Sequence, residues 1–204
     1  MVERELKYSS PSDNIPTFNE LEPILSPYKL SPAKIQQIYD RYYDDALASL
    51  EKSGIGLRKR VINNKRLVTL KISNKNEAGL FEREEIELEQ KSSGWPTPIY
   101  TKILDYCDPA MLRKIIEFKT RRVSFGVVKN REIAIISFDK VTAKQAQKNE
   151  TVEFFEVEIE AVGQTAFKEL KEIASRLGKV IEMSKNTTNK LVRAKALLGL
   201  GLKS

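Results

Sequence analysis

Glutamates at every second position between residues 154 and 161 constrain the fold of this chain more than any other feature. Glu156, Glu158 and Glu160 alternate with apolar residues in this segment. In a β-strand successive side chains point to opposite faces, so the three carboxylates would share one face and the apolar residues the other. Like charges on one face repel one another. The pattern therefore predicts a strand whose acidic face lies against positive groups.

The first residues of the chain show a second alternation of the same kind. Glu3, Glu5 and Lys7 stand at every second position in the segment 2–7, which predicts a strand with one charged face. Two strands at opposite ends of the chain would then each carry such a face. If these strands belong to one closed sheet, the charged faces turn inward. We therefore expect a closed sheet with a polar interior.

Several segments between these two strands also alternate and predict antiparallel strands. Two pairs of them form hairpins, the first turning at Asn63-Asn64-Lys65, because asparagine tolerates the positive φ angles of tight turns. In most of them polar side chains share one face and apolar side chains the other. With the two terminal strands this gives roughly eight strands, the others being 35–43, 55–61, 67–73, 81–90, 118–128 and 132–141.

Amphipathic segments predict helices that cover the apolar outer faces of these strands. Asp108 as N-cap and Pro109 at the first helical position indicate one helix start. Helical segments are expected at 18–25, 44–53, 99–106, 109–116, 164–177 and 188–200. The expected fold is α+β: a closed eight-stranded antiparallel β-barrel, a tunnel with a polar interior, covered by several helices. We expect one domain over residues 1–204.

The chain has no histidine and a single cysteine, Cys107. The absence of histidine removes Ser-His and Cys-His catalysis and every His-ligated metal site, so a metal ion here must be a hard ion held by carboxylates. A single cysteine argues for a reducing compartment. Without a long apolar run or a targeting signal, we expect a cytoplasmic protein with no membrane contact. The net charge of +7 indicates an anionic partner, either nucleic acid or a polyphosphate.

The predicted inner faces of the strands collect both signs of charge. Burying so many charges costs several kcal/mol each unless they are paired or solvated, so a packed core is excluded and a water-filled tunnel remains. Arginine and lysine bind phosphate oxygens, and carboxylates bind Mg²⁺ or Mn²⁺, so the set suits a metal–polyphosphate complex. The alternative is an ordinary sheet face in water with cross-strand ion pairs. The acidic residues are Glu3, Glu5, Glu85, Glu87, Asp139, Glu156 and Glu158, and the basic residues are Lys7, Arg58, Arg60, Lys71 and Arg122.

These motifs resemble those of the CYTH superfamily, the triphosphate tunnel metalloenzymes. The sequence Glu3-Arg4-Glu5-Leu6-Lys7 matches the family's N-terminal Glu-x-Glu-x-Lys signature. The resemblance spans Glu3 to about Arg193 and implies an eight-stranded barrel, divalent cations and hydrolysis of a triphosphate. The further motifs follow in the family's order: Tyr42-Tyr43-Asp44-Asp45, Gly56-Leu57-Arg58-Lys59-Arg60, Thr69-Leu70-Lys71, Arg83-Glu84-Glu85-Ile86-Glu87, Arg121-Arg122, Phe138-Asp139 and Glu156-Val157-Glu158-Ile159-Glu160.

The resemblance also implies roles for individual residues. Glu5, Lys7 and Glu158 would be catalytic, and the cofactor would be two Mg²⁺ or Mn²⁺ ions. The family's lysine before the last helix corresponds to Lys190 or to Lys185, of which Lys190 fits the pattern better. The implied substrate ligands are Lys7, Arg58, Arg60, Lys71, Arg122, Lys190 and Lys185. The implied metal ligands or acidic wall residues are Glu3, Glu5, Glu85, Glu87, Asp139, Glu156 and Glu158, with Glu160 ranked lower.

The expected function is hydrolysis of inorganic tripolyphosphate to diphosphate and phosphate, because no feature announces a pocket for an organic group. The alternatives within the family are a thiamine triphosphatase, for which Trp95 is the available tryptophan, a nucleotide or RNA 5′-triphosphatase, and a class IV adenylyl cyclase. An alternative outside enzymes is a polyphosphate- or RNA-binding module. We expect a small-molecule triphosphate partner, nucleic acid only as a 5′-triphosphate substrate, and a monomer or homodimer.

Overall fold

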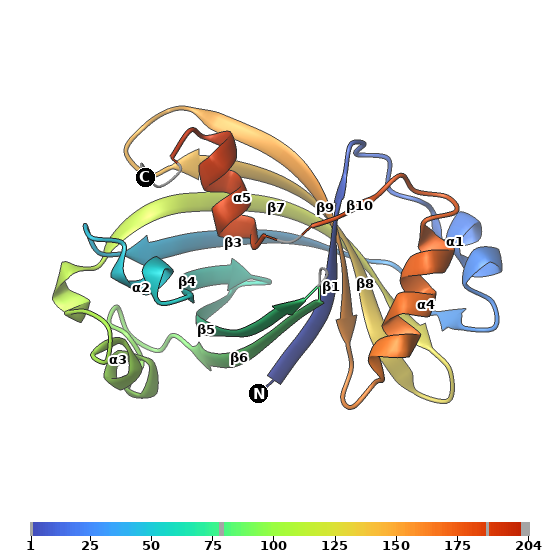
Figure 1. The fold of residues 1–204 in the computed structure, drawn as a ribbon, viewed down its shortest axis with the longest axis horizontal. Coiled ribbons are helices and arrows are strands. Elements are labelled where there is room, and N and C mark those ends of the chain that lie inside the picture. The colour runs from blue at the N-terminus through green and yellow to red at the C-terminus, as the bar shows by residue number, and fades with distance from the viewer. Residues whose placement is uncertain (1, 78–79, 187, 201–204) are drawn as a thin grey trace.

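Eight antiparallel strands close into a barrel in the computed structural model, which describes residues 2–77, 80–186 and 188–200 (Figure 1). Around the barrel the order is β1-β6-β5-β4-β3-β7-β8-β9, and β9 pairs with β1 again. Two short strands flank it: β2 (Lys29–Leu30) pairs with β7 and β10 (Ser184–Lys185) pairs with β1. The barrel strands are β1 (Val2–Ser10), β3 (Lys34–Asp44), β4 (Ile55–Ile62), β5 (Lys65–Glu77), β6 (Leu80–Glu89), β7 (Arg113–Val128), β8 (Glu132–Gln145) and β9 (Thr151–Ala161).

The first strand closes the barrel because it pairs on both of its edges. Its first half pairs with β6, with Glu3 opposite Arg83, and its second half pairs with β9, with Lys7 opposite Glu158. The charged face of each terminal strand is thereby turned into the barrel. The predicted closed barrel with strands from both ends of the chain is confirmed.

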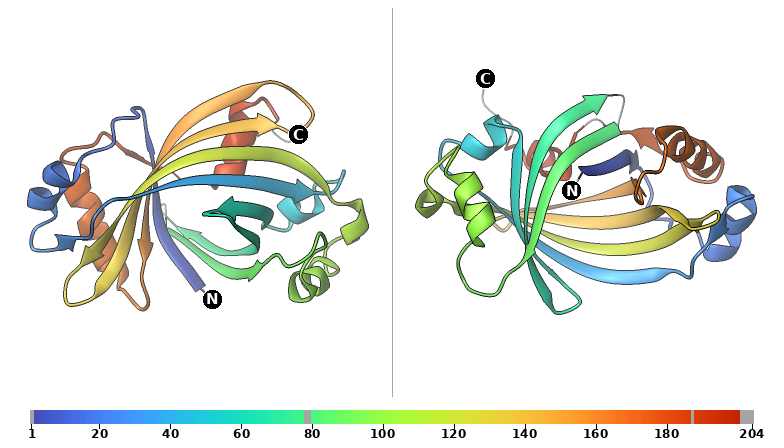
Figure 2. Two further views of the ribbon diagram at one scale, coloured as in Figure 1. Left: turned by 180° about the vertical axis from the view of Figure 1, so that it is seen from behind. Right: turned by 90° about the horizontal axis from the view of Figure 1, so that it is seen from below.

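Helices cover two separate outer faces of the barrel. On one face α1 (Phe18–Leu25) and α4 (Phe167–Leu177) pack over apolar side chains such as Phe125 and Ile159. On another, α2 (Ser49–Lys52) and α3 (Thr97–Ile103) pack over residues such as Leu57 and Leu70. The two helix groups lie at opposite ends of the molecule, and the middle of the sheet between them carries no helix when seen from behind (Figure 2). The fifth helix, α5 (Lys190–Leu197), crosses the front of the barrel (Figure 1).

A third apolar cluster lies inside the barrel, under α5. Tyr42, Phe118 and Phe154 lie on the same strand faces as the charged residues Asp40 and Glu156, at a spacing of two residues. Leu191 of α5 packs onto this cluster. The interior is therefore charged along part of its length and apolar along the rest. The sequence analysis predicted a polar interior and did not predict this apolar part.

The predicted helix at 109–116 is wrong. Only a single 3₁₀ turn (Pro109–Met111) forms there, and β7 begins at Arg113. Asp108 does cap this turn, since its Oδ1 accepts a hydrogen bond from the backbone N–H of Ala110 at 2.8 Å. The following residues pair with the end of β3 instead of continuing a helix, with Arg113 opposite Asp44, because sheet pairing outweighs local helical spacing.

Other local predictions agree closely with the structure. The hairpin between β4 and β5 turns at Asn63 and Asn64, whose φ angles are 48° and 63°. The helices expected at 164–177 and 188–200 form over the shorter ranges of α4 and α5. Within the described residues, no helix has both the length and the apolar composition needed to cross a membrane.

Candidate functional site

A cavity of about 720 Å³ lies inside the charged part of the barrel. Alternation along the strands explains its lining, because every second residue of each strand projects inward. Charged side chains of opposite sign face one another across it, while Tyr42 and Leu191 border its apolar end. The predicted site residues that line the cavity are Glu3, Glu5, Lys7, Arg58, Arg60, Lys71, Glu85, Glu87, Arg122, Glu158 and Lys190.

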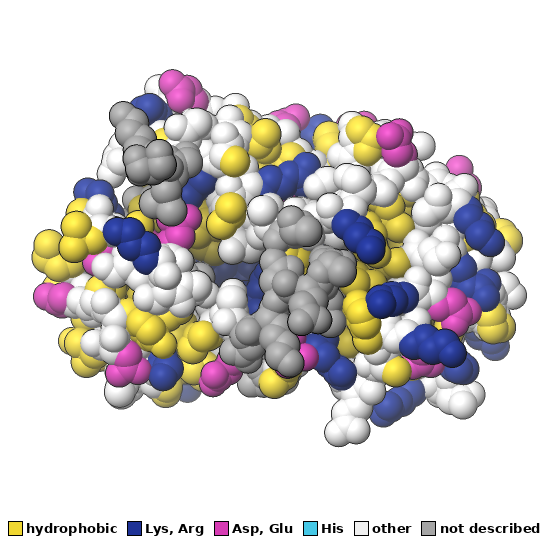
Figure 3. Space-filling model, viewed as in Figure 1, with side chains coloured by type: hydrophobic (Ala, Val, Ile, Leu, Met, Phe, Trp, Pro, Cys, Tyr) yellow, Lys and Arg dark blue, Asp and Glu magenta, His cyan; other side chains and the backbone are white. Residues whose placement is uncertain are grey.

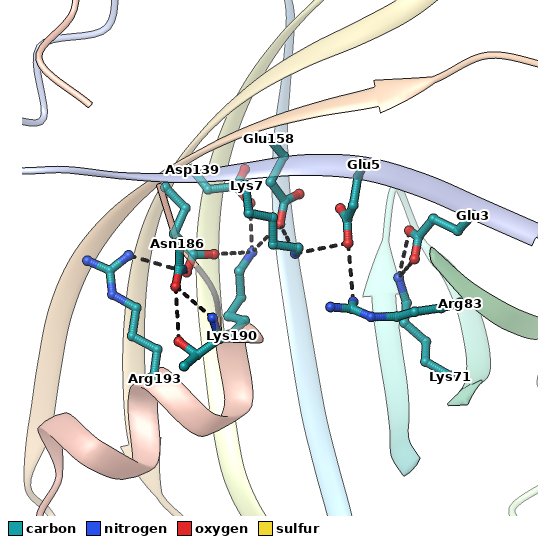
Figure 4. Close-up of polar contacts among 12 residues, drawn as sticks. Glu3, Glu5, Lys7, Lys71, Arg83, Asp139, Glu158, Asn186, Lys190 and Arg193 are labelled. Carbon is teal, nitrogen blue, oxygen red and sulfur yellow. Dashed lines mark hydrogen bonds and ion pairs between the residues drawn. The ribbon is translucent and has the colours of Figure 1, made fainter. Parts of the chain in front are cut away.

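Carboxylates and cations form a continuous network where β1, β7, β8 and β9 meet (Figure 4). The Lys7 Nζ lies 2.6 Å from Glu158 Oε1 and 3.3 Å from Glu5 Oε1. The Arg122 guanidinium donates two hydrogen bonds to Asp139, at 2.7 and 2.6 Å, and one to Glu158 at 2.5 Å. Asp139 is 2% exposed and lies behind the cavity surface, so it orients Arg122 rather than facing the open space.

The start of α5 brings Lys190 into the same network. Asn189 caps the helix, since its Oδ1 accepts a hydrogen bond from the Val192 N–H at 2.9 Å. Lys190 Nζ then reaches Asp139 Oδ2 at 2.7 Å. Lys185, in contrast, is an exposed residue of β10 and lies outside the cavity lining. Of the two lysines left open by the sequence, Lys190 faces the barrel interior and Lys185 does not.

A second group of ion pairs lies at the β1–β6–β5 side of the cavity (Figure 4). Lys71 Nζ donates to both carboxylate oxygens of Glu3 at 2.7 Å and lies 3.3 Å from Glu85. Arg83 Nη1 lies 3.2 Å from Glu5 Oε1. The sequence analysis did not assign Arg83 to the site, although its position on the same strand face as Glu85 was a usable signal.

Two arginines of β4 meet a buried aspartate of β3. Asp40 is 2% exposed and accepts hydrogen bonds from the Nε and Nη2 of Arg60 at 2.7 and 2.8 Å. Arg58 lies 4.0 Å from Asp40 and 3.8 Å from both Glu85 and Glu87. The Nε of Arg58 is buried and has no hydrogen-bond partner among the described residues. Asp40 was missed from the sequence because its neighbours on the inward face are apolar.

Glu156, predicted as a metal ligand, lies behind the cavity and contacts the C-terminal segment. It is 1% exposed and does not line the cavity. Its Oε1 accepts a hydrogen bond from Asn186 Nδ2 at 3.2 Å and lies 3.3 Å from Arg193 Nη1, while Lys190 Nζ is 3.6 Å from Oε2. These contacts fasten the segment before α5 and the helix itself to β9. Arg193 belongs to the pattern that favours Lys190 but was not itself predicted as a site residue, and no sequence pattern indicated Asn186.

The network keeps its cations charged. Burial acts to lower the pKa of Lys7, but the Glu158 and Glu5 carboxylates outweigh it and raise the pKa above its ordinary value. The same balance raises the pKa of Lys190, through Asp139 and Glu158. Lys7 and Lys190 therefore act as fixed positive charges at neutral pH and not as bases.

The carboxylates at the β9 edge differ from one another. Burial acts to raise the pKa of Glu158, but Lys190 and Lys7 hold it well below its ordinary value. Burial, followed by the charges of Glu3, Glu5 and Glu158, raises the pKa of Glu160 to about 7. Glu160 thus faces several carboxylates with too little positive charge beside it.

The carboxylates gathered around Glu160 are the chemical basis on which a divalent cation fits this side of the cavity. All the candidate ligands are oxygens, which Mg²⁺ and Mn²⁺ prefer. In the described ranges no three Asp, Glu or Cys side chains are grouped so that they could hold an ion as they stand. Lys71 is paired with Glu3, and Lys7 with Glu158. The residues that would hold the cation are Glu3, Glu5 and Glu158, released from those lysines.

A protein-family comparison matches the model of the CYTH domain to residues 1–191. A search of curated proteins finds no match. Solved structures at identities of 19–21% share the fold along nearly the whole chain. A putative adenylyl cyclase from Hippeastrum, HpAC1, described as having a dominant triphosphatase activity, is 21% identical, covers 98% of each chain and has a TM-score of 0.62. A putative adenylate cyclase from Bacillus halodurans is 20% identical over 93% of this chain and 95% of its own, with a TM-score of 0.59. The PH1819 protein from Pyrococcus horikoshii is 19% identical over 97% and 98%, with a TM-score of 0.55.

Proposed function

Because the chain belongs to the CYTH domain family, we propose that it hydrolyses a triphosphate in the barrel cavity with the help of a divalent cation. The substrate we propose first is inorganic tripolyphosphate, cleaved to diphosphate and phosphate. The observation that carries the proposal is the Arg58 guanidinium, which is buried at the cavity wall with its Nε unpaired among the described residues. A buried charged donor without a partner is costly, and a phosphate oxygen would satisfy it.

Other cations of the cavity are placed to hold the rest of the phosphate chain. A second buried donor atom, Nη2 of Arg83, also lacks a hydrogen-bond partner in the described part of the chain. Lys71, Arg122 and Lys190 line the same cavity, and each is now held by carboxylates. Phosphate oxygens would replace those carboxylates as partners, and Asp40 would keep Arg60 in place.

In the proposed reaction a water oxygen bonds to a terminal phosphorus and the bridging P–O bond breaks. The bond electrons leave with the diphosphate, and the water proton passes to a cavity carboxylate or to solvent. A bound Mg²⁺ or Mn²⁺ would neutralise phosphate charge and acidify the water. Lys7, held between Glu5 and Glu158, would keep a fixed positive charge beside the phosphate as charge develops.

The test is phosphate release from tripolyphosphate by the purified chain with Mg²⁺, with Mn²⁺, and with chelator in excess. We expect turnover that needs a divalent ion and stops with chelator. A protein that binds tripolyphosphate tightly without any metal-dependent release would be a binding module instead, and the proposal would fail.

The size of the cavity favours a second candidate, an organic triphosphate. Its volume of about 720 Å³ lies in the range of small-molecule pockets and leaves room beyond three phosphates. Tyr42 and Leu191 offer an apolar surface at one end. Thiamine triphosphate, ATP and 5′-triphosphorylated RNA should therefore be assayed beside tripolyphosphate, with product analysis to separate hydrolysis from cyclisation.

A further inference from the structure

One broad outer face of the barrel carries no helix. It is formed by the middle of β3 with its neighbours β4, β7 and β8, and is seen in the left view of Figure 2. Large apolar side chains remain in water there: Tyr39 is 48% exposed, Ile35 61% and Val61 38%. Elsewhere on the barrel such outer side chains are covered by α1 and α4 or by α2 and α3. This face therefore lacks the cover that the others have.

Cations stand directly opposite one another on this face. The register pairs Arg41 with Lys59 across β3 and β4, and Arg121 with Lys140 across β7 and β8. Like charges directly opposite each other in a sheet are destabilising. Burial first, and then the charge of Arg41, lower the pKa of Lys59, whose Nζ donates a hydrogen bond to the Ser93 carbonyl at 3.0 Å. We call Tyr39, Arg41, Lys59, Lys119, Arg121 and Lys140 the basic outer face.

The acidic side chains nearby pair with two cations of this face, Arg41 and Lys140, and leave the others unpaired by them. Glu117 lies 2.5 Å from Lys114 and 3.5 Å from Arg41, so it is already shared by two cations. Glu153 accepts a hydrogen bond from Thr142 and lies 3.8 Å from Lys140, and Asp13 lies 3.7 Å from the same lysine. Both carboxylates therefore stand at one edge of the face, beside Lys140.

Two cations beside the exposed tyrosine have no counter-ion. Lys119, opposite Tyr39 in the register, and the neighbouring Arg121 are exposed and form no ion pair with any described residue. On the other side of Tyr39 in the register stands Val61. An exposed aromatic ring thus lies between an apolar side chain and uncompensated positive charge.

We propose that the basic outer face binds single-stranded nucleic acid, its cations holding the phosphate backbone and Tyr39 stacking on a base. Sheet faces that present an aromatic ring among cations are a recurrent means of binding single strands. A lipid surface is the less suitable polyanion, because the face is the middle of a sheet with no protruding apolar segment. None of its residues lines the cavity, so the proposal does not depend on the triphosphatase activity.

The test uses a 20-nucleotide RNA with a 5′-hydroxyl and a 3′-fluorophore, so that no triphosphate can enter the cavity. Raising the salt concentration from 50 to 200 mM should weaken binding about 50-fold if four side chains contact phosphates. Each contact contributes about −0.7 to the slope of log K against log salt concentration for single strands. The four side chains are Arg41, Lys119, Arg121 and Lys140. The double variant Lys119→Ser/Arg121→Ser should halve that slope. Tyr39→Ala should weaken binding about 5- to 160-fold.

The matched control is Lys168→Ser/Lys179→Ser, which removes the same charge from exposed positions in and after α4. It should bind like the unaltered protein, and all these variants should keep whatever tripolyphosphate hydrolysis the unaltered chain has. Equal loss in the control pair would show a mere effect of net charge and overturn the proposal. Displacement of the RNA by stoichiometric tripolyphosphate would show that the RNA binds in the cavity, and this result would also overturn the proposal. Binding to phosphatidylserine vesicles but not to RNA would assign the face to membranes.

Discussion

Replacing Asp40 by asparagine should destabilise the protein, because it removes the negative charge that two arginines share. Asp40 is 2% exposed and forms two hydrogen bonds to Arg60, with Arg58 4.0 Å away. Removing one partner of a buried ion pair costs about 3–5 kcal/mol, and the amide keeps part of the hydrogen bonding, so we expect about 3 kcal/mol for Asp40→Asn. For a chain of this length that is about 6–12 °C in Tm.

The assay is thermal unfolding at pH 7, with Asp105→Asn as the matched control. Asp105 pairs with Lys102 at 3.1 Å, but its side chain is 58% exposed, so its loss should cost less than about 0.5 kcal/mol. Equal and small effects of the two substitutions would refute the reasoning, since they would mean that the Asp40 pair contributes no more than a surface pair.

The pH dependence of this difference is a second check on the Asp40 substitution. Burial acts to raise the pKa of Asp40, but Arg60 and Arg58 hold it below its ordinary value of 3.8. A depressed pKa contributes stability that is fully present above the unfolded value and is lost as pH falls through the folded value. The gap in unfolding free energy between wild type and Asp40→Asn should therefore be constant above about pH 5 and narrow below 3.8. A gap that widened on acidification would contradict the assignment.

Three further predictions concern activity. Glu5→Gln should lower metal-dependent turnover at least about 100-fold while circular dichroism stays unchanged, and near-normal rates would exclude Glu5 as a metal ligand. Lys71→Ala should raise KM for tripolyphosphate about tenfold or more, from the loss of a charge-assisted hydrogen bond, with kcat affected less; an unchanged KM would rule out a phosphate contact. Lys190→Ala should weaken substrate binding at least about tenfold, whereas Lys185→Ala, on the exposed strand, should stay within about twofold in the same steady-state assay. Equal effects of the two would contradict the placement of α5.

Much of the fold could be predicted because charge and apolarity alternate on the strands. The alternation around Glu5 and Glu158 is strict, and it correctly predicted which side chains turn inward. The helix predicted at 109–116 is wrong because Ile115 and Ile116 at the start of β7, together with Met111 and Leu112, also fit helical spacing. Only the pairing of Arg113 with Asp44 of a distant strand decides between the two, and no local pattern contains it.

The site was predicted less completely, for a related reason. Asp40 lies between Ile38 and Tyr42, its two neighbours on the inward face, so the sequence shows an acid flanked by apolar side chains. Its role depends on Arg60, which stands opposite it in the register of β3 and β4. The place of Glu156 in the alternation agrees with the structure, but the C-terminal segment covers this side chain, and its role as a metal ligand stays a prediction. Alternation predicts a face, whereas cover and register arise from contacts between distant segments.

The pairing within the cavity has a consequence for how ligands would enter it. Lys71 is held by Glu3, and Lys7 by Glu158, so each proposed phosphate ligand neutralises a proposed metal ligand. If a metal ion bound alone, it would take the carboxylates and leave the lysines without partners. If a phosphate chain bound alone, it would take the lysines and leave the carboxylates without partners. Only when both enter are all charges paired again, which makes their binding free energies interdependent. Diphosphate, the proposed product, should therefore bind the unaltered protein at least about tenfold more tightly with Mg²⁺ than with Na⁺ at equal ionic strength in calorimetric titrations, in which no triphosphate is turned over. Equal affinities would mean that the ion pairs of the cavity do not exchange partners on binding.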